Sequence, residues 1–104
     1  MTPKSCGEGC PIVTLVSFIS KKWMLFIIRA IADGASCYSE MEKELQNINP
    51  SILSSRLKEL QDFGFVEKKI VSESPVKIEY KLTKKGKSFS QQIENIVNWS
   101  VEWM

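Results

Sequence analysis

The stretch from Asn49 to Gly64 combines a helix start signal, a helical period and a helix stop signal in one run. Asn49 is suited to be the N-cap, because its side-chain oxygen can accept a hydrogen bond from a free backbone N–H of the first turn. Pro50 then takes the first helical position, where its missing N–H costs nothing. Gly64 can adopt the left-handed conformation that ends a helix. The sequence therefore predicts one helix here, and the rest of the chain must fold so as to cover its apolar side.

The two faces of this helix differ in chemistry. At about 100° per residue, the outer face is small, hydroxylated and basic, and it centres on Ser51, Ser55, Lys58 and Asp62. The opposite face carries Leu53, Arg56, Leu57 and Leu60. Short hydroxyl side chains allow a close approach, and Ser, Lys and Arg donate to phosphates or base edges in a major groove. An ordinary solvated helix also has polar residues opposite an apolar stripe, so this helix alone leaves both interpretations open.

The distribution of charge along the chain is uneven, although the net charge is only +2. A chain of 104 residues with 43% hydrophobic residues is predicted to form one small domain, marginal in stability unless it associates. Residues 1–48 carry five basic and five acidic groups, residues 49–88 carry nine and five, and residues 89–104 carry none and two. The basic excess coincides with the predicted helix and the segment after it, which suits an anionic partner.

The composition disfavours several classes of protein. The longest apolar run, Trp23–Ile28, is far shorter than the roughly 20 residues of a membrane span, and no signal peptide precedes it, so a cytoplasmic protein without a membrane partner is expected. The absence of histidine excludes a Cys/His zinc site and a histidine-dependent catalytic triad. Three cysteines, Cys6, Cys10 and Cys37, cannot all pair within one chain and are expected to be mostly reduced. We expect no catalytic residue, no metal and no cofactor.

Three further helices are predicted before Asn49. They are expected over residues 12–19, Trp23–Asp33 and Tyr38–Gln46. Residues 1–9 are expected to be a flexible arm, ahead of a single domain over residues 10–104. Because only a short turn separates the third helix from the fourth, the two form a helix-turn-helix.

After Gly64 the period changes from helical to alternating. In Val76–Leu82 the even-numbered residues are apolar and the odd-numbered ones are charged, which predicts a strand with one face in water. Residues 65–71 are its expected antiparallel partner, and residues 72–75 form the loop. The hairpin carries Lys68, Lys69, Lys77 and Lys81. Lysine on an edge strand deters aggregation and also suits contact with phosphates, and both interpretations stay open.

A final helix is predicted from Lys84 to about Trp103, with Thr83 as its N-cap. Its apolar area is larger than the core of so small a domain needs, so part of it should meet a partner chain. Closure of the domain's own core is the alternative. A homodimer interface is expected to use residues of the first and last helices, namely Ile12, Val16, Ile93, Val97, Trp99 and Trp103.

The predicted order of elements is that of a mainly α winged helix-turn-helix with a β-hairpin wing, in which terminal dimerisation helices are added to a DNA-binding three-helix core. Residues that narrow this further are Cys10-Pro11, Lys22-Trp23, Leu53-Ser54, Arg56-Leu57, Glu59-Leu60, Gly64-Phe65-Val66, Pro75, Glu79-Tyr80, Leu82-Thr83, Gly86 and Trp99. In this order and spacing they resemble the HxlR-type transcriptional regulators over about residues 10–103. Two departures are Cys37-Tyr38, where the family has an Arg-Phe pair, and Pro75-Val76, where it has two prolines.

The resemblance implies a sequence-specific transcriptional regulator that binds a palindromic site in double-stranded DNA as a homodimer. The helix after Asn49 would lie in the major groove, and the hairpin on the flanking backbone or minor groove. By position, base-edge or close backbone contact is expected for Ser51, Ser54, Ser55 and Lys58, and phosphate contact for Lys68, Lys69 and Lys77. Arg56 is ambiguous, because the helical wheel turns it toward the core and only its tip can reach solvent.

Cys10 occupies the position of a thiol that senses oxidants or electrophiles in several members that the resemblance brings in. A helix N-terminus favours the thiolate that such sensing requires, because its free N–H groups stabilise negative charge. An inert cysteine buried under the dimer helix is the alternative. Cys6, in a glycine-rich arm, is the expected resolving partner, within the chain or across the dimer. Cys37 is expected to cap or pack at a helix start.

Two other functions stay open on sequence alone. A winged helix can bind protein or RNA instead of duplex DNA, because a fold does not fix a function. Duplex binding would show a steep salt dependence and a strong preference for one palindrome. A small enzyme would be restricted to cysteine redox chemistry, which is disfavoured because the C-x3-C spacing of Cys6 and Cys10 lacks a surrounding βαβ pattern.

Overall fold

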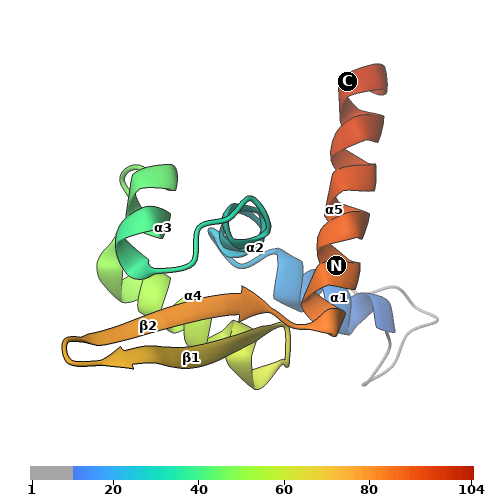
Figure 1. The fold of residues 1–104 in the computed structure, drawn as a ribbon. Helices are drawn as coiled ribbons and strands as arrows, with labels where there is room; N and C mark the ends of the chain where they lie inside the picture. Colours follow the sequence, from blue (N-terminus) through green and yellow to red (C-terminus); the bar gives the residue numbers. More distant parts are fainter. Residues whose placement is uncertain (1–10) are drawn as a thin grey trace.

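The computed structural model describes residues 11–104, which form five α-helices and a two-stranded antiparallel hairpin (Figure 1). The elements in chain order are α1 (Pro11–Ile19), α2 (Met24–Ala32), α3 (Tyr38–Glu44), α4 (Pro50–Asp62), β1 (Val66–Glu73), β2 (Val76–Leu82) and α5 (Lys84–Trp103). This is the predicted winged helix-turn-helix, with β1 and β2 as the wing. The arm expected at residues 1–9 lies outside the described residues.

Both ends of α4 have the structure that the sequence predicts. The Asn49 side-chain oxygen accepts a hydrogen bond from the Ser51 N–H at 2.7 Å, and Pro50 follows as the first helical residue. At the other end Gly64 has a φ of 79°. The N–H groups after the last turn donate back to its carbonyls, which satisfies groups that a helix end leaves free. Local signals alone therefore set where α4 begins and ends.

The core lies between α2, α3, α4 and the base of the wing. α2 is central to it, and Met24, Ile27 and Ile28 have no exposed surface. The leucines of the predicted apolar stripe on α4 are also buried: Leu53, Leu57 and Leu60. Burying one such side chain contributes about 1.5–3 kcal/mol. The stripe therefore fixes the rotation of α4 about its axis and turns its other face to solvent.

α1 begins one residue earlier than predicted, whereas α2 and α3 are shorter than predicted. α2 begins at Met24 and not at Trp23, because Trp23 has a left-handed φ of 73°. α3 ends at Glu44, before the expected Gln46, and Asn47 takes a φ of 73° in the turn that follows. Within residues 11–104 no single helix is long and apolar enough to cross a membrane, and α1 and α2 satisfy that test only as a pair bent by 79°.

The hairpin is longer than the alternating pattern predicts. β1 extends to Glu73, two residues beyond the expected end, and pairs with β2 as far as Val76. A register shift between Ile70 and Ser72 inserts one extra residue, which lets pairing continue across a break in the alternation. Tyr80 at the base is buried, whereas Ile70 and Val76 are 63% and 65% exposed. Alternation therefore marks a half-buried strand only at the base of the wing.

α5 is anchored at its start and projects at its end (Figure 1). Thr83 is its N-cap as predicted, and its hydroxyl accepts from the Gly86 N–H at 3.1 Å. A Cβ at Gly86 would lie 2.0 Å from the Phe65 carbonyl oxygen, so only glycine allows α5 to approach the entry to β1 this closely. The first half of α5 packs on α2 and β2. The second half extends beyond the core.

Candidate nucleic-acid interface

The outer face of α4 is the first candidate surface. The inner face rests on α2 and β1, and α3 precedes it across the turn of the helix-turn-helix. Four predicted contact residues are all exposed on the outer face: Ser51, Ser54, Ser55 and Lys58. The structure therefore brings short hydroxyl groups and one ammonium group together on the solvent-exposed face of one helix. Such a face can enter a groove and donate hydrogen bonds to its floor or walls.

Ser54 differs from the other serines because its hydroxyl has a partner within the chain. The Tyr38 hydroxyl, at the start of α3, lies 2.5 Å from the Ser54 Oγ. The Tyr38 ring packs edge to face on Tyr80, with the ring centroids 6.0 Å apart. Burial raises the pKa of Tyr80, so its phenol stays neutral near pH 7. This contact fixes Ser54 and links the base of the wing to α4.

Arg56 lies apart from the serine face. Its Nε donates to the Lys22 carbonyl oxygen at 2.8 Å, and its Nη1 donates to the Glu59 carboxylate at 2.6 Å. The Lys21 ammonium also donates to Glu59. The Arg56 and Glu59 side chains are 21% and 23% exposed, so this cluster is partly shielded from water. It ties α4 to the turn between α1 and α2, and thereby holds the outer face of α4 in position.

This cluster should make stability depend on pH. The hydrogen bond from Lys21 lowers the pKa of Glu59 below its ordinary 4.5, against the opposing effect of burial. Because the folded-state pKa is the lower one, the carboxylate stabilises the fold fully above about pH 4.5, and this contribution disappears as the pH falls through the folded-state value. Glu59→Gln should therefore reduce the free energy of unfolding by about 1 kcal/mol at neutral pH.

Urea unfolding of the parent and Glu59→Gln, from about pH 7 down to pH 3, measures this effect. The two stabilities should converge at the acid end. Glu67→Gln is the matched control, since Glu67 is exposed and its nearest cation, Lys69, is 4.0 Å away. A stability difference that stayed constant over this range would contradict the role given to Glu59.

The wing carries four exposed lysines, and three of them, Lys68, Lys69 and Lys77, are the predicted phosphate contacts; the fourth is Lys81. Lys69 lies 4.0 Å from Glu67, a separation at which an exposed pair contributes little. Lys68 and Lys77 form no ion pair with any residue in the described range. β1 lies next to α4 in the fold, so the basic wing and the serine face belong to neighbouring elements (Figure 1).

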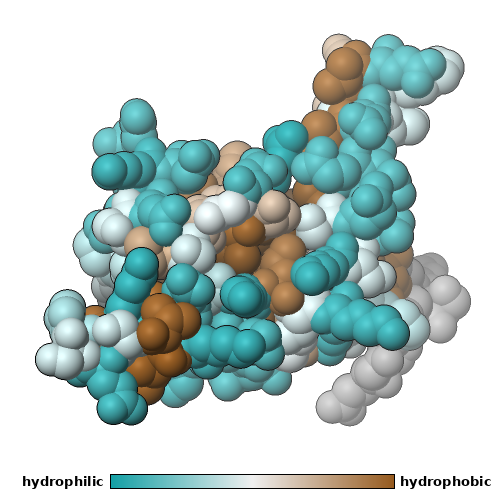
Figure 2. Space-filling view, in the orientation of Figure 1, coloured by the Kyte–Doolittle hydropathy of each residue, from teal (hydrophilic) through white to brown (hydrophobic). Residues whose placement is uncertain are grey.

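A second candidate surface lies on α1 and α5. Four of the residues predicted for a dimer interface are between 50% and 70% exposed: Ile12, Val16, Trp99 and Trp103. Val97 is partly buried, and Ile93, only 8% exposed, belongs to the core of its own chain. An apolar groove of about 390 Å³ runs between α1, α2 and α5. Figure 2 shows hydrophobic side chains along the projecting end of α5. Exposed apolar residues gathered on two neighbouring helices are typical of a surface that meets another protein.

The described residues include one cysteine, Cys37, at the N-cap of α3 as predicted. Its Sγ does not cap a backbone N–H. It lies 3.3 Å from the Ser39 hydroxyl and donates to the Glu40 carboxylate at 3.1 Å, which lowers the pKa of Glu40. The other two cysteines, Cys6 and Cys10, lie outside the described part of the chain.

The sequence did not predict the roles of Tyr38, Lys21 and Glu59. Arg56 and Glu59 are three apart, a spacing that favours pairing on a helix, and this was the one local signal for the cluster. Lys21 is 38 residues from Glu59, and Tyr38 is 16 residues from Ser54. No local period connects residues at such separations, because the fold alone brings them together.

Comparison with known proteins agrees with this fold and with the order of its elements. The family of HxlR-like helix-turn-helix proteins matches residues 18–104. YvaP of Bacillus subtilis, named as an HTH-type transcriptional regulator, is 39% identical over 99 residues, which are 94% of this chain and 92% of YvaP. The reduced form of the transcriptional regulator YodB from B. subtilis is similar in structure, with a TM-score of 0.79 and 30% identity over 90% of this chain and 93% of YodB.

Two further solved structures are of a relative treated with diamide and of one in its oxidized form. YodB has also been solved after diamide treatment, with a TM-score of 0.76 to this chain and 30% identity over 93% of this chain and 97% of that one. The redox regulator HypR in its oxidized form has a TM-score of 0.71 and 29% identity, over 90% of this chain and 93% of HypR. By the family match and the identity to YvaP, the chain belongs to the HxlR-like helix-turn-helix family of transcriptional regulators.

Proposed function

We propose that the protein binds a palindromic operator in duplex DNA as a homodimer, with α4 of each protomer in the major groove. The observation that carries this proposal is the exposed hydroxyl and basic face of α4, opposite a fully buried leucine stripe. Base-edge or close backbone contact is assigned to Ser51, Ser54, Ser55 and Lys58. Arg56 has two of its donors engaged within the chain, so we assign it chiefly to holding α4 in place.

The wing supplies the part of binding that does not depend on sequence. Lys68, Lys69 and Lys77 are exposed, and ammonium groups that neutralise phosphates release counterions from DNA. Such contacts set the register and orientation of a protein on the duplex but do not read bases. We therefore assign affinity and salt dependence to the wing, and sequence preference to α4.

The exposed apolar residues of α1 and α5 support the homodimer. The projecting half of α5 leaves Trp99 and Trp103 in water, and aromatic residues are enriched at the centres of interfaces. A two-fold dimer would present two copies of α4 to two half-sites about 34 Å apart, which is one helical turn. We place the protein in the cytoplasm, as a regulator without enzymatic activity, as its named relatives suggest.

The proposal is tested by sequencing the genomic fragments that the purified protein retains. A palindrome shared by the retained fragments is expected, with half-sites one turn apart. Retention without a common sequence would contradict base reading by α4. If single-stranded RNA is offered in the same experiment, its preferential retention would favour the alternative of an RNA-binding winged helix.

We further propose that Cys10 makes DNA binding responsive to oxidation, with Cys6 as its resolving partner. Support comes from the relatives, since HypR is named a redox regulator and YodB has been solved in reduced and diamide-treated forms. Diamide accepts two electrons and two protons from two thiols, becomes the hydrazine and leaves an S–S bond. Such a bond near the start of α1 would lie close to the proposed dimer surface and would change the spacing of the two recognition helices.

Diamide treatment should therefore change the operator affinity of the parent by about tenfold, a coupling typical of a switch between two states. Cys10→Ser should bind equally before and after treatment, and Cys37→Ser should respond as the parent does. Dithiothreitol should reverse the change. Equal operator affinity of the parent in both redox states would instead support the alternative that Cys10 is inert.

A further inference from the structure

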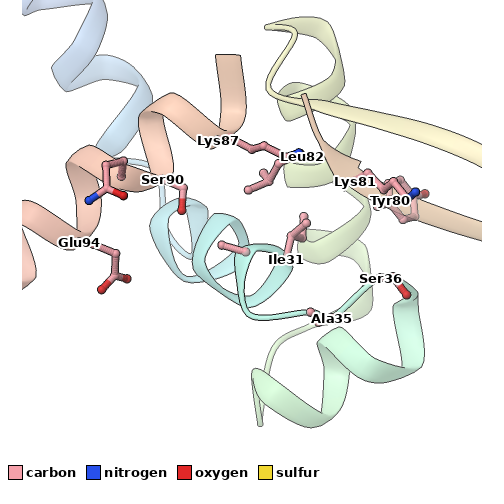
Figure 3. Close-up of a pocket in the computed structure, with 12 residues that line it drawn as sticks. Ile31, Ala35, Ser36, Tyr80, Lys81, Leu82, Lys87, Ser90 and Glu94 are labelled. Atoms are coloured by element: carbon pink, nitrogen blue, oxygen red, sulfur yellow. The ribbon is translucent and has the colours of Figure 1, made fainter. Parts of the chain in front are cut away.

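A cavity of about 580 Å³ opens between the end of α2, β2 and the first half of α5 (Figure 3). Ile31, Tyr80 and Leu82 form an apolar wall, and α5 contributes a polar wall with Lys87 and Ser90. Sites for small molecules commonly measure about 300–1,000 Å³ and combine an apolar lining with a few polar groups. This cavity lies away from the serine face of α4 and from the apolar groove on α1 and α5.

The charges that line the cavity do not cancel. Glu94, the one carboxylate among its described lining residues, is engaged by Arg29, with Nε 3.0 Å from the carboxylate oxygen. Lys87 forms no ion pair with a described residue, whereas Lys81 lies on the face of β2 opposite to Tyr80 and Leu82 and has Glu67 as its cross-strand neighbour. In Figure 3 Lys87 extends from α5 toward β2, and the hydroxyl of the buried Ser90 points toward α2. The cavity therefore has an excess of positive charge beside an apolar wall.

We propose that this cavity binds a small organic anion with an apolar body, of which an aromatic carboxylate is the simplest example. The carboxylate would lie at Lys87 and Ser90, because charge-assisted hydrogen bonds are about twice as strong as neutral ones. The ring would pack against Ile31, Leu82 and the Tyr80 ring. An inorganic anion leaves the apolar wall in water, and a neutral aromatic molecule leaves the Lys87 ammonium without a counter-charge. Only a ligand with both parts satisfies the cavity.

The cavity is connected to α4 by a short series of contacts. The Tyr80 N–H donates to the Ser36 carbonyl oxygen at 2.7 Å, and both residues line the cavity. The Tyr80 ring packs on Tyr38, whose hydroxyl bonds to Ser54. A ligand seated between β2 and Ser36 displaces Tyr80, and this displacement reaches Ser54 through Tyr38. We therefore expect the ligand to weaken operator binding, an expectation that rests on the proposed function.

Ligand binding is tested first on the full chain without DNA, by titrating benzoate and following the amide signals in ¹⁵N–¹H spectra. Shifts should concentrate on residues that line the cavity. Benzyl alcohol and inorganic phosphate, at matched ionic strength, should bind at least about tenfold more weakly, since each lacks one of the two parts. Phosphate binding as tight as that of benzoate, or shifts confined to other regions, would overturn the site.

Three variants locate the ligand. Lys87→Gln should weaken benzoate binding about tenfold, as expected for loss of one charge-assisted hydrogen bond. Lys84→Gln is the matched control, because it removes a lysine from the same helix outside the cavity. Ala32→Phe places a ring in the cavity from an exposed position of its wall and should abolish binding with little change in Tm. Equal benzoate affinity of Lys87→Gln and the parent would contradict the proposed pose.

Coupling to DNA is tested separately, as operator affinity with and without saturating benzoate. A decrease of at least about fivefold is expected for the parent, and bound operator should lower benzoate affinity by the same factor. At a benzoate concentration that saturates only the parent, Lys87→Gln should bind operator as it does without ligand. Benzoate that binds in the cavity but leaves operator affinity unchanged would refute the coupling without affecting the proposed function. Failure of the unliganded parent to bind any operator would refute the proposed function and leave the cavity result standing.

Discussion

Ser55→Glu should abolish specific operator binding while the protein remains folded. Ser55 is exposed on the outer face of α4, so a carboxylate there adds no strain to the core. In the proposed complex the carboxylate would face phosphate oxygens and base acceptors. A juxtaposition of like charges costs several kcal/mol at an interface, which corresponds to a loss of at least about 100-fold in affinity. Fluorescence anisotropy with labelled operator measures this loss.

Lys69→Ala provides the contrast to Ser55→Glu, because it removes a proposed phosphate contact and not a base contact. It should weaken binding to all sequences alike and reduce the slope of log K against log salt concentration by about one unit. Both variants should keep the parent's Tm. If Ser55→Glu bound the operator as tightly as the parent, the assignment of α4 to the major groove would be wrong.

Trp103→Glu should dissociate the proposed dimer. Trp103 is 70% exposed at the projecting end of α5, and loss of an aromatic residue that anchors an interface typically costs at least about 2 kcal/mol. The introduced carboxylate would also have to be buried unpaired, so the dimer dissociation constant should rise at least about 30-fold. Operator affinity should fall when the dimer dissociates, because linking two half-site contacts raises the affinity about 10²–10⁴-fold over that of one contact.

Light scattering at micromolar protein concentration measures the dissociation of the proposed dimer. Glu102→Gln is the control, since it changes an exposed side chain of the same turn without adding a charge. The control should remain a dimer. A parent protein that is monomeric at this concentration would remove the basis for a two-fold arrangement on DNA.

The parts of the fold that the sequence predicts are those that local chemistry determines. Asn49, Pro50 and Gly64 define α4, and Thr83 defines the start of α5. The spacing of the leucines identifies which face of α4 is buried, and therefore which serines are exposed. Element ends were less accurate where a residue other than glycine takes a left-handed conformation. Trp23 shortens α2 in this way, since no propensity rule anticipates φ 73° at a tryptophan.

The contacts that hold the candidate site together could not be predicted, because they join distant parts of the chain. The hydrogen bond of Tyr38 to Ser54 and the cluster of Arg56, Glu59 and Lys21 depend on how α3, α4 and the turn before α2 pack. The cavity beside Lys87 likewise assembles three segments whose residues carry no motif. Ile93 was expected at the dimer interface but is buried in the core of its own chain. A helical wheel identifies the apolar face of a helix, but it does not show whether that face packs on the same chain or on a second one.

Reading of duplex DNA by α4 of a homodimer can be measured by comparing affinity for the selected palindrome with affinity for a scrambled duplex of equal length, between about 50 and 200 mM salt. We expect a preference of at least about 10³ for the palindrome, with one dimer bound per site. The logarithm of the affinity for both duplexes should fall steeply and linearly with the logarithm of the salt concentration. Equal affinity for the palindrome and the scrambled duplex at every salt concentration would contradict base reading by α4.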